Sequence, residues 1–166
     1  KFQTRGAVRS TPCYYRDKLF VVSADGYLYA LNVRTGQQLW NTNIGTRNVF
    51  GSPVIERQKV LVAAGDRLLA YDTETGNIRW SFTSAGLIVG SAAIKDRRAY
   101  IGSRDGSLYC LDANNGVALW RYPSEGTYEP ISSSPSIQGN TIVYRSGARS
   151  VLAVDIGPNA GQLVWQ

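Results

Sequence analysis

The sequence predicts an all-β protein in which a four-stranded antiparallel unit is repeated four times. Three observations support this fold class: the spacing of the tryptophans, the residues around each of them, and the regular placement of turn-forming pairs. The tryptophans stand at positions 40, 80, 120 and 165, so the intervals between them are 40, 40 and 45 residues. Such a period is typical of a solenoid, a propeller or an array. No stretch shows convincing helical periodicity.

The residues before each tryptophan repeat with it. In the first three copies a small residue, an Asp or Asn, and a Gly stand at fixed distances from the Trp. The small residues are Ala30, Ala70 and Cys110, and the glycines are Gly36, Gly76 and Gly116. The fourth copy has Ala153, Gly161 and Trp165, with two extra residues between Asp155 and Gly161. A single Trp–Gly match would be weak evidence, whereas four in register indicate a structural repeat.

Each period divides into four short strands. In the first copy we expect them at Thr11–Tyr15, Leu19–Ser23, Tyr27–Asn32 and Gln37–Thr42. The turn between the second and third strands is marked by pairs that readily adopt a positive φ. These pairs are Asp25-Gly26, Gly65-Asp66, Asp105-Gly106 and Ser146-Gly147. The next turn contains the motif glycine, which also suits a positive φ.

A repeated four-stranded unit with one Trp per unit favours a β-propeller, because a sandwich or a single barrel has no such repeat. The pattern small-x-Asp-x-x-Thr-Gly-x-x-x-Trp resembles the repeat of the quinoprotein (PQQ-like) β-propeller family. The resemblance covers essentially the whole chain. It divides the chain into repeats at about 7–45, 46–86, 87–126 and 127–166, with 1–6 as the tail of a preceding blade.

The resemblance also implies a role for the repeated residues. In that family the Trp ring stacks between the small residue of its own motif and the Gly peptide of the adjacent blade. We therefore expect a structural docking set in this chain. Its members are Ala30, Gly36, Trp40, Ala70, Gly76, Trp80, Cys110, Gly116, Trp120, Ala153, Gly161 and Trp165.

Both ends of the chain fall at the same phase of the repeat, because Lys1 stands where the residue after a Trp belongs and Gln166 follows Trp165. The sequence contains no Met, which suggests a processed or excised piece. Three arrangements remain open. The resemblance favours an arc of a seven- or eight-bladed ring; two copies could instead pair as a homodimer with eight blades, or four blades could close alone.

Composition and charge limit the function classes. The chain has 18 Lys and Arg against 12 Asp and Glu, a net charge of +6, and no His. Many basic residues belong to expected hairpin turns, where solvated side chains are the ordinary interpretation. The sequence has no RNA-binding motif or aromatic stacking platform, and no apolar run of about 18 residues. We expect no nucleic-acid partner and no membrane span.

A quinone-dependent dehydrogenase is the enzyme class that the resemblance raises. Such enzymes use an acidic base, a metal ion held by carboxylate and amide oxygens, and often an adjacent pair of cysteines. Here Cys13 and Cys110 are far apart in sequence, and Cys110 occupies the small docking position. The carboxylates fall in turn or motif positions that the fold explains. We therefore expect no catalytic residue, no metal site and no cofactor.

The connections between repeats vary in sequence where the framework does not, which is typical of binding positions. Alignment of the repeats makes Val8, Val49, Ile88 and Ile131 one repeated apolar position, expected in the core. Six neighbouring residues are candidate partner-binding residues. They are Arg9, Arg47, Phe50, Leu87, Tyr128 and Glu129.

The function predicted from the sequence is a non-catalytic β-propeller scaffold that binds a partner protein, or further propeller blades, through rim and axial loops. The alternatives are a fragment of a PQQ-dependent dehydrogenase and a purely structural repeat segment. The family that the chain resembles includes, besides dehydrogenases, a lipoprotein that assists outer-membrane barrel assembly and the sensor domains of bacterial membrane kinases. Both imply a periplasmic or extracellular location.

Overall fold

The computed structural model describes residues 1–123, 129–157 and 160–165. These residues form four four-stranded antiparallel sheets, here called blades 1 to 4. Blade 1 contains β1 (Cys13–Tyr15), β2 (Lys18–Ser23), β3 (Tyr27–Asn32) and β4 (Gln38–Asn43). Blade 2 contains β5 (Val54–Glu56), β6 (Lys59–Ala64), β7 (Arg67–Asp72) and β8 (Ile78–Thr83). Blade 3 contains β9 (Ala93–Lys95), β10 (Arg98–Gly102), β11 (Leu108–Asp112) and β12 (Ala118–Tyr122). Blade 4 contains β13 (Ser136–Gln138), β14 (Thr141–Ser146), β15 (Ser150–Asp155) and β16 (Gln162–Trp165).

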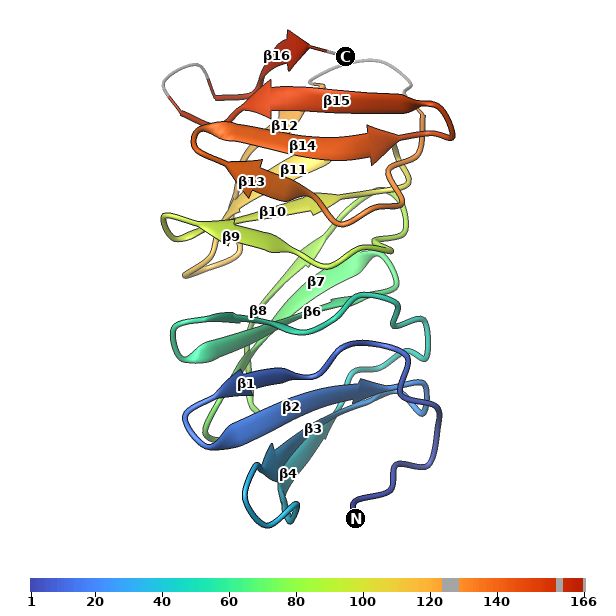
Figure 1. The fold of residues 1–166 in the computed structure, drawn as a ribbon, viewed down its shortest axis with the longest axis vertical. Coiled ribbons are helices and arrows are strands. Elements are labelled where there is room, and N and C mark those ends of the chain that lie inside the picture. Colours follow the sequence, from blue (N-terminus) through green and yellow to red (C-terminus); the bar gives the residue numbers. More distant parts are fainter. Residues whose placement is uncertain (124–128, 158–159, 166) are drawn as a thin grey trace.

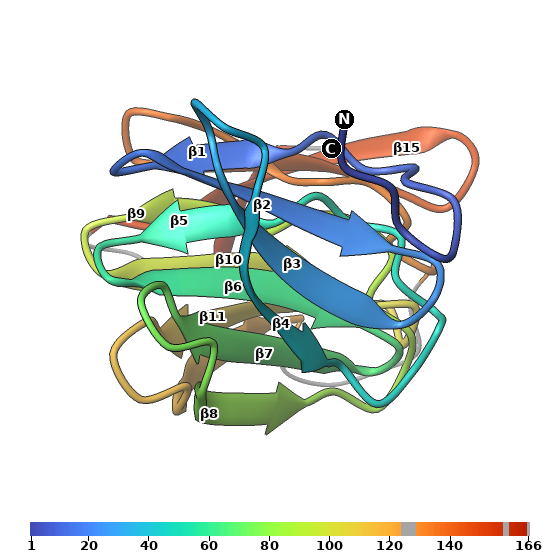
Figure 2. The ribbon, with the colours of Figure 1, turned by 90° about the horizontal axis from the view of Figure 1, so that it is seen from below.

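The blades stack face to face in chain order, from blade 1 at one end to blade 4 at the other (Figure 1). Figure 2 looks along the stack and shows successive sheets turned relative to one another. The innermost strands contact one another in the order β1, β5, β9, β13. The all-β propeller architecture predicted from the sequence is confirmed, and the described blades form an open arc. The alternative in which four blades close alone is not what the structure shows.

Tight turns set the strand boundaries. The expected positive φ is present in the second-to-third strand turns, for example 90° at Gly26. The first-to-second strand turns of blades 1 to 3 also adopt a positive φ, at residues that are not glycine, including 47° at Arg16 and 59° at Asp17. Two consecutive left-handed residues form the two-residue hairpin that matches the twist of the strands. The sequence analysis located these hairpins but did not predict their left-handed backbone.

The core lies between blades rather than inside one blade. One apolar cluster joins blades 1 and 2, a second joins blades 2 and 3, and a third joins blades 3 and 4. Ile88 and Ile131 are fully buried in the second and third clusters, and Val49 packs against the first. Val8 was expected in the core by the same alignment, but it is 44 % exposed. That prediction was wrong because this position packs against the preceding blade, and blade 1 has none among the described residues.

Candidate functional site

The chain has two kinds of candidate binding surface. One is formed by the faces that dock one blade on the next, and the other is the edge that contains the connections between blades. The docking contact is clearest between blades 2 and 3. The Trp80 indole nitrogen donates a hydrogen bond to the Ala113 carbonyl oxygen at 3.1 Å. A Cβ atom added at Gly116 would lie 2.6 Å from the Trp80 ring. The ring therefore packs directly on the Gly116 backbone, where a larger residue would collide.

The same contact joins blades 1 and 2. The Trp40 indole nitrogen donates to the Thr73 carbonyl oxygen at 3.3 Å, and a Cβ atom at Gly76 would lie 2.7 Å from the Trp40 ring. Thr42 adds a hydrogen bond from its hydroxyl to the Gly76 carbonyl oxygen at 2.7 Å. The tryptophan of one blade thus contacts the glycine turn of the next, which is the pairing that the resemblance implies.

The contact between blades 3 and 4 is looser. A Cβ atom at Gly161 would lie 3.6 Å from the Trp120 ring, and the Trp120 indole nitrogen is buried without an acceptor among the described residues. The two extra residues of the fourth copy explain the difference. The Gly161 N–H bonds to the carbonyl of Asp155, six residues back, whereas the Gly116 N–H bonds to Asp112, four residues back. The described residues of this wider turn do not offer the indole the carbonyl that the other turns supply.

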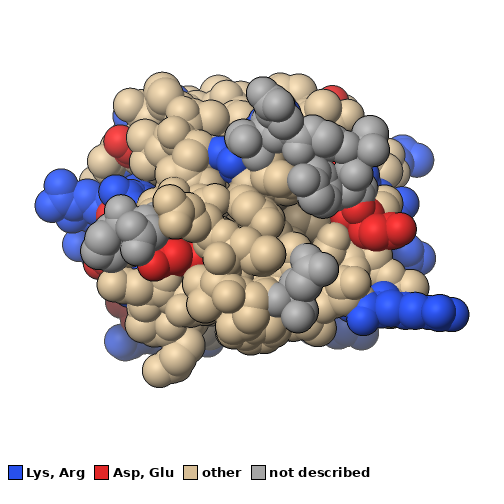
Figure 3. All heavy atoms as spheres, turned by 90° about the horizontal axis from the view of Figure 1, so that it is seen from above, with Lys and Arg blue, Asp and Glu red and all other residues tan. Residues whose placement is uncertain are grey.

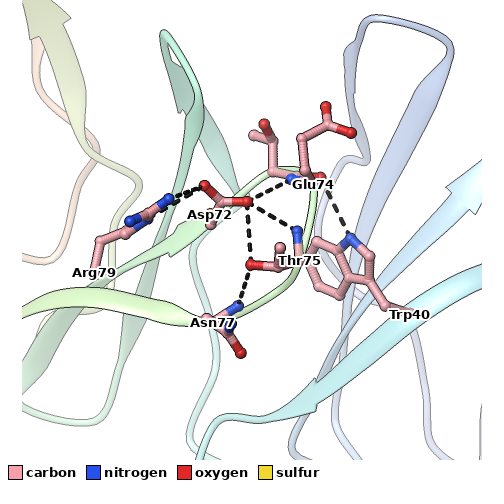
Figure 4. A network of polar contacts seen from close by, with 7 residues as sticks. Trp40, Asp72, Glu74, Thr75, Asn77 and Arg79 are labelled. Atoms are coloured by element: carbon pink, nitrogen blue, oxygen red, sulfur yellow. Dashed lines mark hydrogen bonds and ion pairs between the residues drawn. The ribbon is translucent and has the colours of Figure 1, made fainter.

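A buried carboxylate fixes the glycine turn of blade 2 (Figure 4). Asp72 Oδ1 accepts hydrogen bonds from the backbone N–H groups of Glu74 and Thr75 at 2.9 and 2.8 Å. Asp72 Oδ2 accepts from the Arg79 guanidinium, with the shorter bond at 2.5 Å. The Arg79 guanidinium is the main cause that lowers the pKa of Asp72 to about 2. This carboxylate stays ionised and shapes the turn that receives Trp40, a structural role rather than a catalytic one.

At the two ends of the stack, the docking residues have no neighbouring blade among the described residues. Trp165 is 49 % exposed, and a Cβ atom added at Gly36 would meet no atom within 4 Å. The four small residues of the docking set remain fully buried in their own blades. They are Ala30, Ala70, Cys110 and Ala153.

The second surface is the edge at the right of Figure 1, which we call the rim. It contains the connections between blades and the turns between second and third strands. Five of the six candidate binding residues are exposed there, while Tyr128 lies outside the described residues. The five are Arg9, Arg47, Phe50, Leu87 and Glu129. Phe50 and Leu87 expose 51 % and 37 % of their surface, so both apolar side chains are accessible to a partner.

The rim has three shallow hollows, and each contains a carboxylate and a guanidinium. The first, of about 360 Å³, is lined by Asp25 and Arg47 among others. The second, of about 410 Å³, is lined by Asp66, Arg67 and Leu87. The third, of about 250 Å³, is lined by Glu129 and Arg149.

The candidates are thus distributed over successive hollows rather than gathered in one pocket, and Arg9 and Phe50 line none of the three. Asp25 and Asp66 were identified from the sequence as turn residues, but neither they nor Arg149 were named as candidate binding residues. The turn pairs were the available signal, because these turns lie beside the connections.

Hydrogen bonds hold the Asp25 carboxylate in place at the rim. Burial acts to raise its pKa, but the Tyr29 hydroxyl at 2.8 Å and the Tyr27 N–H at 3.0 Å lower it on balance. The Arg5 backbone N–H also donates to Asp25 Oδ2, at 3.0 Å. Blade 3 repeats this arrangement, since Tyr109 and the Ala85 N–H donate to Asp105 Oδ2 at 2.7 and 3.1 Å. A carboxylate is therefore held by hydrogen bonds at the rim of blades 1 and 3.

The opposite edge, formed by the first-to-second strand turns, contains much of the basic charge. Several of these charges are already paired. Lys18 contacts Glu74 of the next blade at 2.7 Å, and Arg34 contacts Asp17 at 3.6 Å. Exposed pairs of this kind contribute little to stability. They do reduce the free positive charge that a nucleic acid would need.

The described residues offer no cluster of ligands for a catalytic metal. No group of three or more His, Cys, Asp or Glu in the described ranges could hold a metal ion. Cys13 and Cys110 are free thiols, and burial raises the pKa of each, to about 12 and about 11. They are protonated at neutral pH and are not adjacent. Among the described residues, no helix is long and apolar enough to cross a membrane.

Stacked four-stranded blades, in which Trp40 and Trp80 pack on the glycine turn of the following blade, define a β-propeller of PQQ-like repeats. Comparison with known families agrees with this class. The family model described as "Outer membrane protein assembly factor BamB" matches residues 1–54 and 25–166. The chain belongs to this PQQ-like propeller family.

Individual relatives show the extent of the match. The outer membrane protein assembly factor BamB of Shewanella oneidensis is 27 % identical over 168 residues, which cover 90 % of this chain and 41 % of the relative. The crystal structure of BamB from Moraxella catarrhalis matches with a TM-score of 0.80 at 18 % identity, over 99 % of this chain and 53 % of that one. The quinohemoprotein alcohol dehydrogenase of Comamonas testosteroni gives a TM-score of 0.79 at 19 % identity, over 96 % and 34 %. The chain therefore spans about half or less of these relatives.

Proposed function

We propose that the chain is a non-catalytic propeller scaffold that binds a partner protein along its rim. The row of three hollows supports this function most directly, because each offers both a carboxylate and a guanidinium beside exposed backbone. A protein segment lying along the rim would present its own charges and amide groups to successive hollows. Shallow, repeated hollows suit such a segment better than one small molecule, which prefers a deep apolar pocket.

The exposed apolar residues of the rim supply the anchors. Phe50 and Leu87 stand on successive connections, and aromatic residues often dominate the binding energy of interfaces. Arg9 and Arg47 would orient an acidic or carbonyl-rich segment of the partner, since a guanidinium can bind two oxygens at once. Tyr128, which the sequence analysis grouped with them, stays a prediction.

The relatives suggest the setting. Several are named as outer membrane protein assembly factors, and we propose by analogy a periplasmic or extracellular location and a protein partner of a membrane-associated assembly. The chain spans only part of these relatives, so the location and the partner are proposed from family likeness.

A double substitution tests the rim. Phe50→Ala with Leu87→Ala should reduce capture of the partner from a detergent extract of source-cell membranes at least tenfold, while the thermal midpoint changes by only a few degrees. The matched control is Ile78→Ala with Val117→Ala, which removes apolar groups that are at least as exposed and lie away from the rim. Loss of capture in the control, or normal capture by the rim variant, would refute the assignment.

Two other functions are separated by further measurements. A fragment of a quinoprotein dehydrogenase is favoured by the likeness to the C. testosteroni enzyme. It predicts that titration with the quinone and Ca²⁺ yields a bound chromophore. A purely structural segment predicts that neither a chromophore nor a captured protein is found.

A further inference from the structure

The contact between blades 1 and 2 lacks one aromatic side chain that the other two contacts between blades contain. Two residues after the motif tryptophan, blade 2 has Phe82 and blade 3 has Tyr122. Phe82 packs on Tyr109 of blade 3 with ring centroids 5.1 Å apart, and Tyr122 packs against the apolar cluster that joins blades 3 and 4. Blade 1 has Thr42 at this position, in the same register with its third strand. The space that a ring fills elsewhere is therefore not filled by blade 1.

A hollow of about 320 Å³ lies beside Thr42, and we call it the inter-blade groove. Residues of blade 2, and of blade 1 and the connection that follows it, line the groove. Those used below are Thr42, Ile44, Arg67, Leu69, Tyr71 and Ile78. Ile44 and Leu69 are buried, whereas Ile78 is 56 % exposed. Leu69 stands at the position that Tyr109 has in blade 3, so a ring in the groove would lie against Leu69 as Phe82 lies against Tyr109.

Blade 2 also departs from the repeat at Arg67. Three residues before the small docking residue, the other blades have Tyr27, Ser107 and Ser150. The Arg67 guanidinium donates a long hydrogen bond to the Ile44 carbonyl oxygen, at 3.4 Å, and forms no ion pair with a carboxylate among the described residues. Its remaining N–H groups can therefore bind an anion, and a guanidinium binds a carboxylate through two parallel hydrogen bonds.

Tyr71 adds a hydrogen-bond donor to the groove. The other blades have apolar residues at its position, namely Leu31, Leu111 and Val154. Tyr71 is 2 % exposed, and its hydroxyl has no hydrogen-bond partner in the described part of the chain. Burial raises the pKa of this hydroxyl, while the charge of Arg67 acts in the opposite direction, so the group is protonated and can donate. A buried hydroxyl without a partner costs free energy, which an oxygen atom of a ligand in the groove would recover.

Three departures from the repeat, Thr42, Arg67 and Tyr71, thus meet in one groove. We propose that this groove binds a small aromatic carboxylate, a molecule in which a short chain joins one aromatic ring to one carboxylate. The ring would lie against Leu69, in the space that Phe82 fills in the next contact. The carboxylate would bind Arg67, and the Tyr71 hydroxyl would donate to one of its oxygens. Leu69 and Arg67 are two residues apart on β7, so their side chains leave the same face of the strand about 7 Å apart, and such a ligand can reach both.

Charge alone does not select this groove. The chain has a net charge of +6, and Figure 3 shows Lys and Arg side chains around the edge of the blade 4 end rather than in one patch. The attraction of an anion to such dispersed, exposed charges is screened by salt. Selection must therefore come from the ring space beside Thr42 together with the Arg67 and Tyr71 donors. Ligands that lack either the ring or the charge should bind weakly.

Titration of the 166-residue chain with hydrocinnamate at about 0.15 M salt, followed by NMR, tests the proposal. We expect saturable binding with a Kd of roughly 1 mM, because a small ligand in an open groove gains limited binding free energy. Thr42→Phe should weaken binding at least tenfold, since it fills the groove with the ring that blade 2 has at this position. Thr42→Val is the matched control, which removes the hydroxyl without filling the space and should bind as the unchanged chain does. Tyr71→Phe removes only a hydroxyl without a described partner, so it should preserve the fold and weaken binding at least threefold.

Two further ligands separate the ring from the charge. The neutral amide of hydrocinnamate retains the ring, and acetate retains the carboxylate, so each should bind at least tenfold more weakly than hydrocinnamate. No saturable binding, unchanged binding by Thr42→Phe or by Tyr71→Phe, or equal binding of the amide would each overturn the proposal. Arg67 is kept in every variant because it also lines the second rim hollow. These outcomes leave partner capture at the rim untouched, so the two proposals fail independently.

Discussion

At the scale of single residues, the acidic groups of this chain act as parts of turns. Asp72 combines two backbone hydrogen bonds with an Arg79 contact, whereas Asn32 at the same position in blade 1 makes only the backbone bonds, to Arg34 and Thr35. The fold thus needs an oxygen acceptor at this position, and the contact of the carboxylate with Arg79 is an addition seen in blade 2. The contribution of the Arg79 contact to the free energy of unfolding can therefore be measured separately from that of the turn.

Asp72→Asn should preserve the turn and remove the charge-assisted contact. We expect the free energy of unfolding to fall by about 1 kcal/mol at neutral pH, because the Arg79 partner is largely solvent-exposed. The pKa of Asp72 is lowered by folding to about 2, so its stabilisation is complete above the ordinary carboxyl pKa and is lost as pH falls toward 2. Urea unfolding between about pH 2 and pH 7 should therefore show the two proteins converging at the acid end.

Asp112→Asn is the matched control for that measurement. Asp112 accepts a backbone hydrogen bond from Asn114 at 2.7 Å in the equivalent turn of blade 3. Because no arginine contact like that of Arg79 is described for Asp112, this variant should lose less stability at neutral pH. A loss equal to that of Asp72→Asn would show that the Arg79 contact contributes nothing.

At the scale of elements, the docking turns differ in one measurable respect. The Trp80 indole N–H has an acceptor and the Trp120 indole N–H has none among the described residues. Trp80→Phe removes the ring nitrogen together with its hydrogen bond and leaves the Ala113 carbonyl unpaired. It should cost about 1–2 kcal/mol more than Trp120→Phe, where the polar group is already unsatisfied. Chemical denaturation of the two variants checks this order, and a larger loss at Trp120 would contradict it.

Much of the element scale could be predicted from the sequence, because the repeat reports local chemistry four times. The strands and the turn glycines follow from residue spacing alone. The left-handed Arg16 and Asp17 were missed, since no glycine marks that hairpin. Two other features were also missed: the looser contact of Trp120 with the longer fourth turn, and the hollow that Asp66 and Leu87 share. Both depend on how neighbouring blades meet, which residue spacing within one blade does not report.

At the scale of the whole molecule, the chain is a one-dimensional stack in which each blade contacts only its neighbours. Stability in such a stack is approximately a sum of blade terms and interface terms. The apolar clusters lie between blades, so an inner blade is stabilised on both faces and an end blade on one. Val8 illustrates the difference, because it has the sequence of a core position and the exposure of a surface one.

Truncating an inner and an end tryptophan measures that difference. Trp80 is 8 % exposed and packs on Gly116, so Trp80→Ala should lower the free energy of unfolding by about 3–5 kcal/mol. Trp165 is 49 % exposed, so Trp165→Ala should cost about 1 kcal/mol or less in a single copy. Chemical denaturation of the two variants measures the difference. Losses of equal size would mean that Trp165 is docked, in conflict with an open stack.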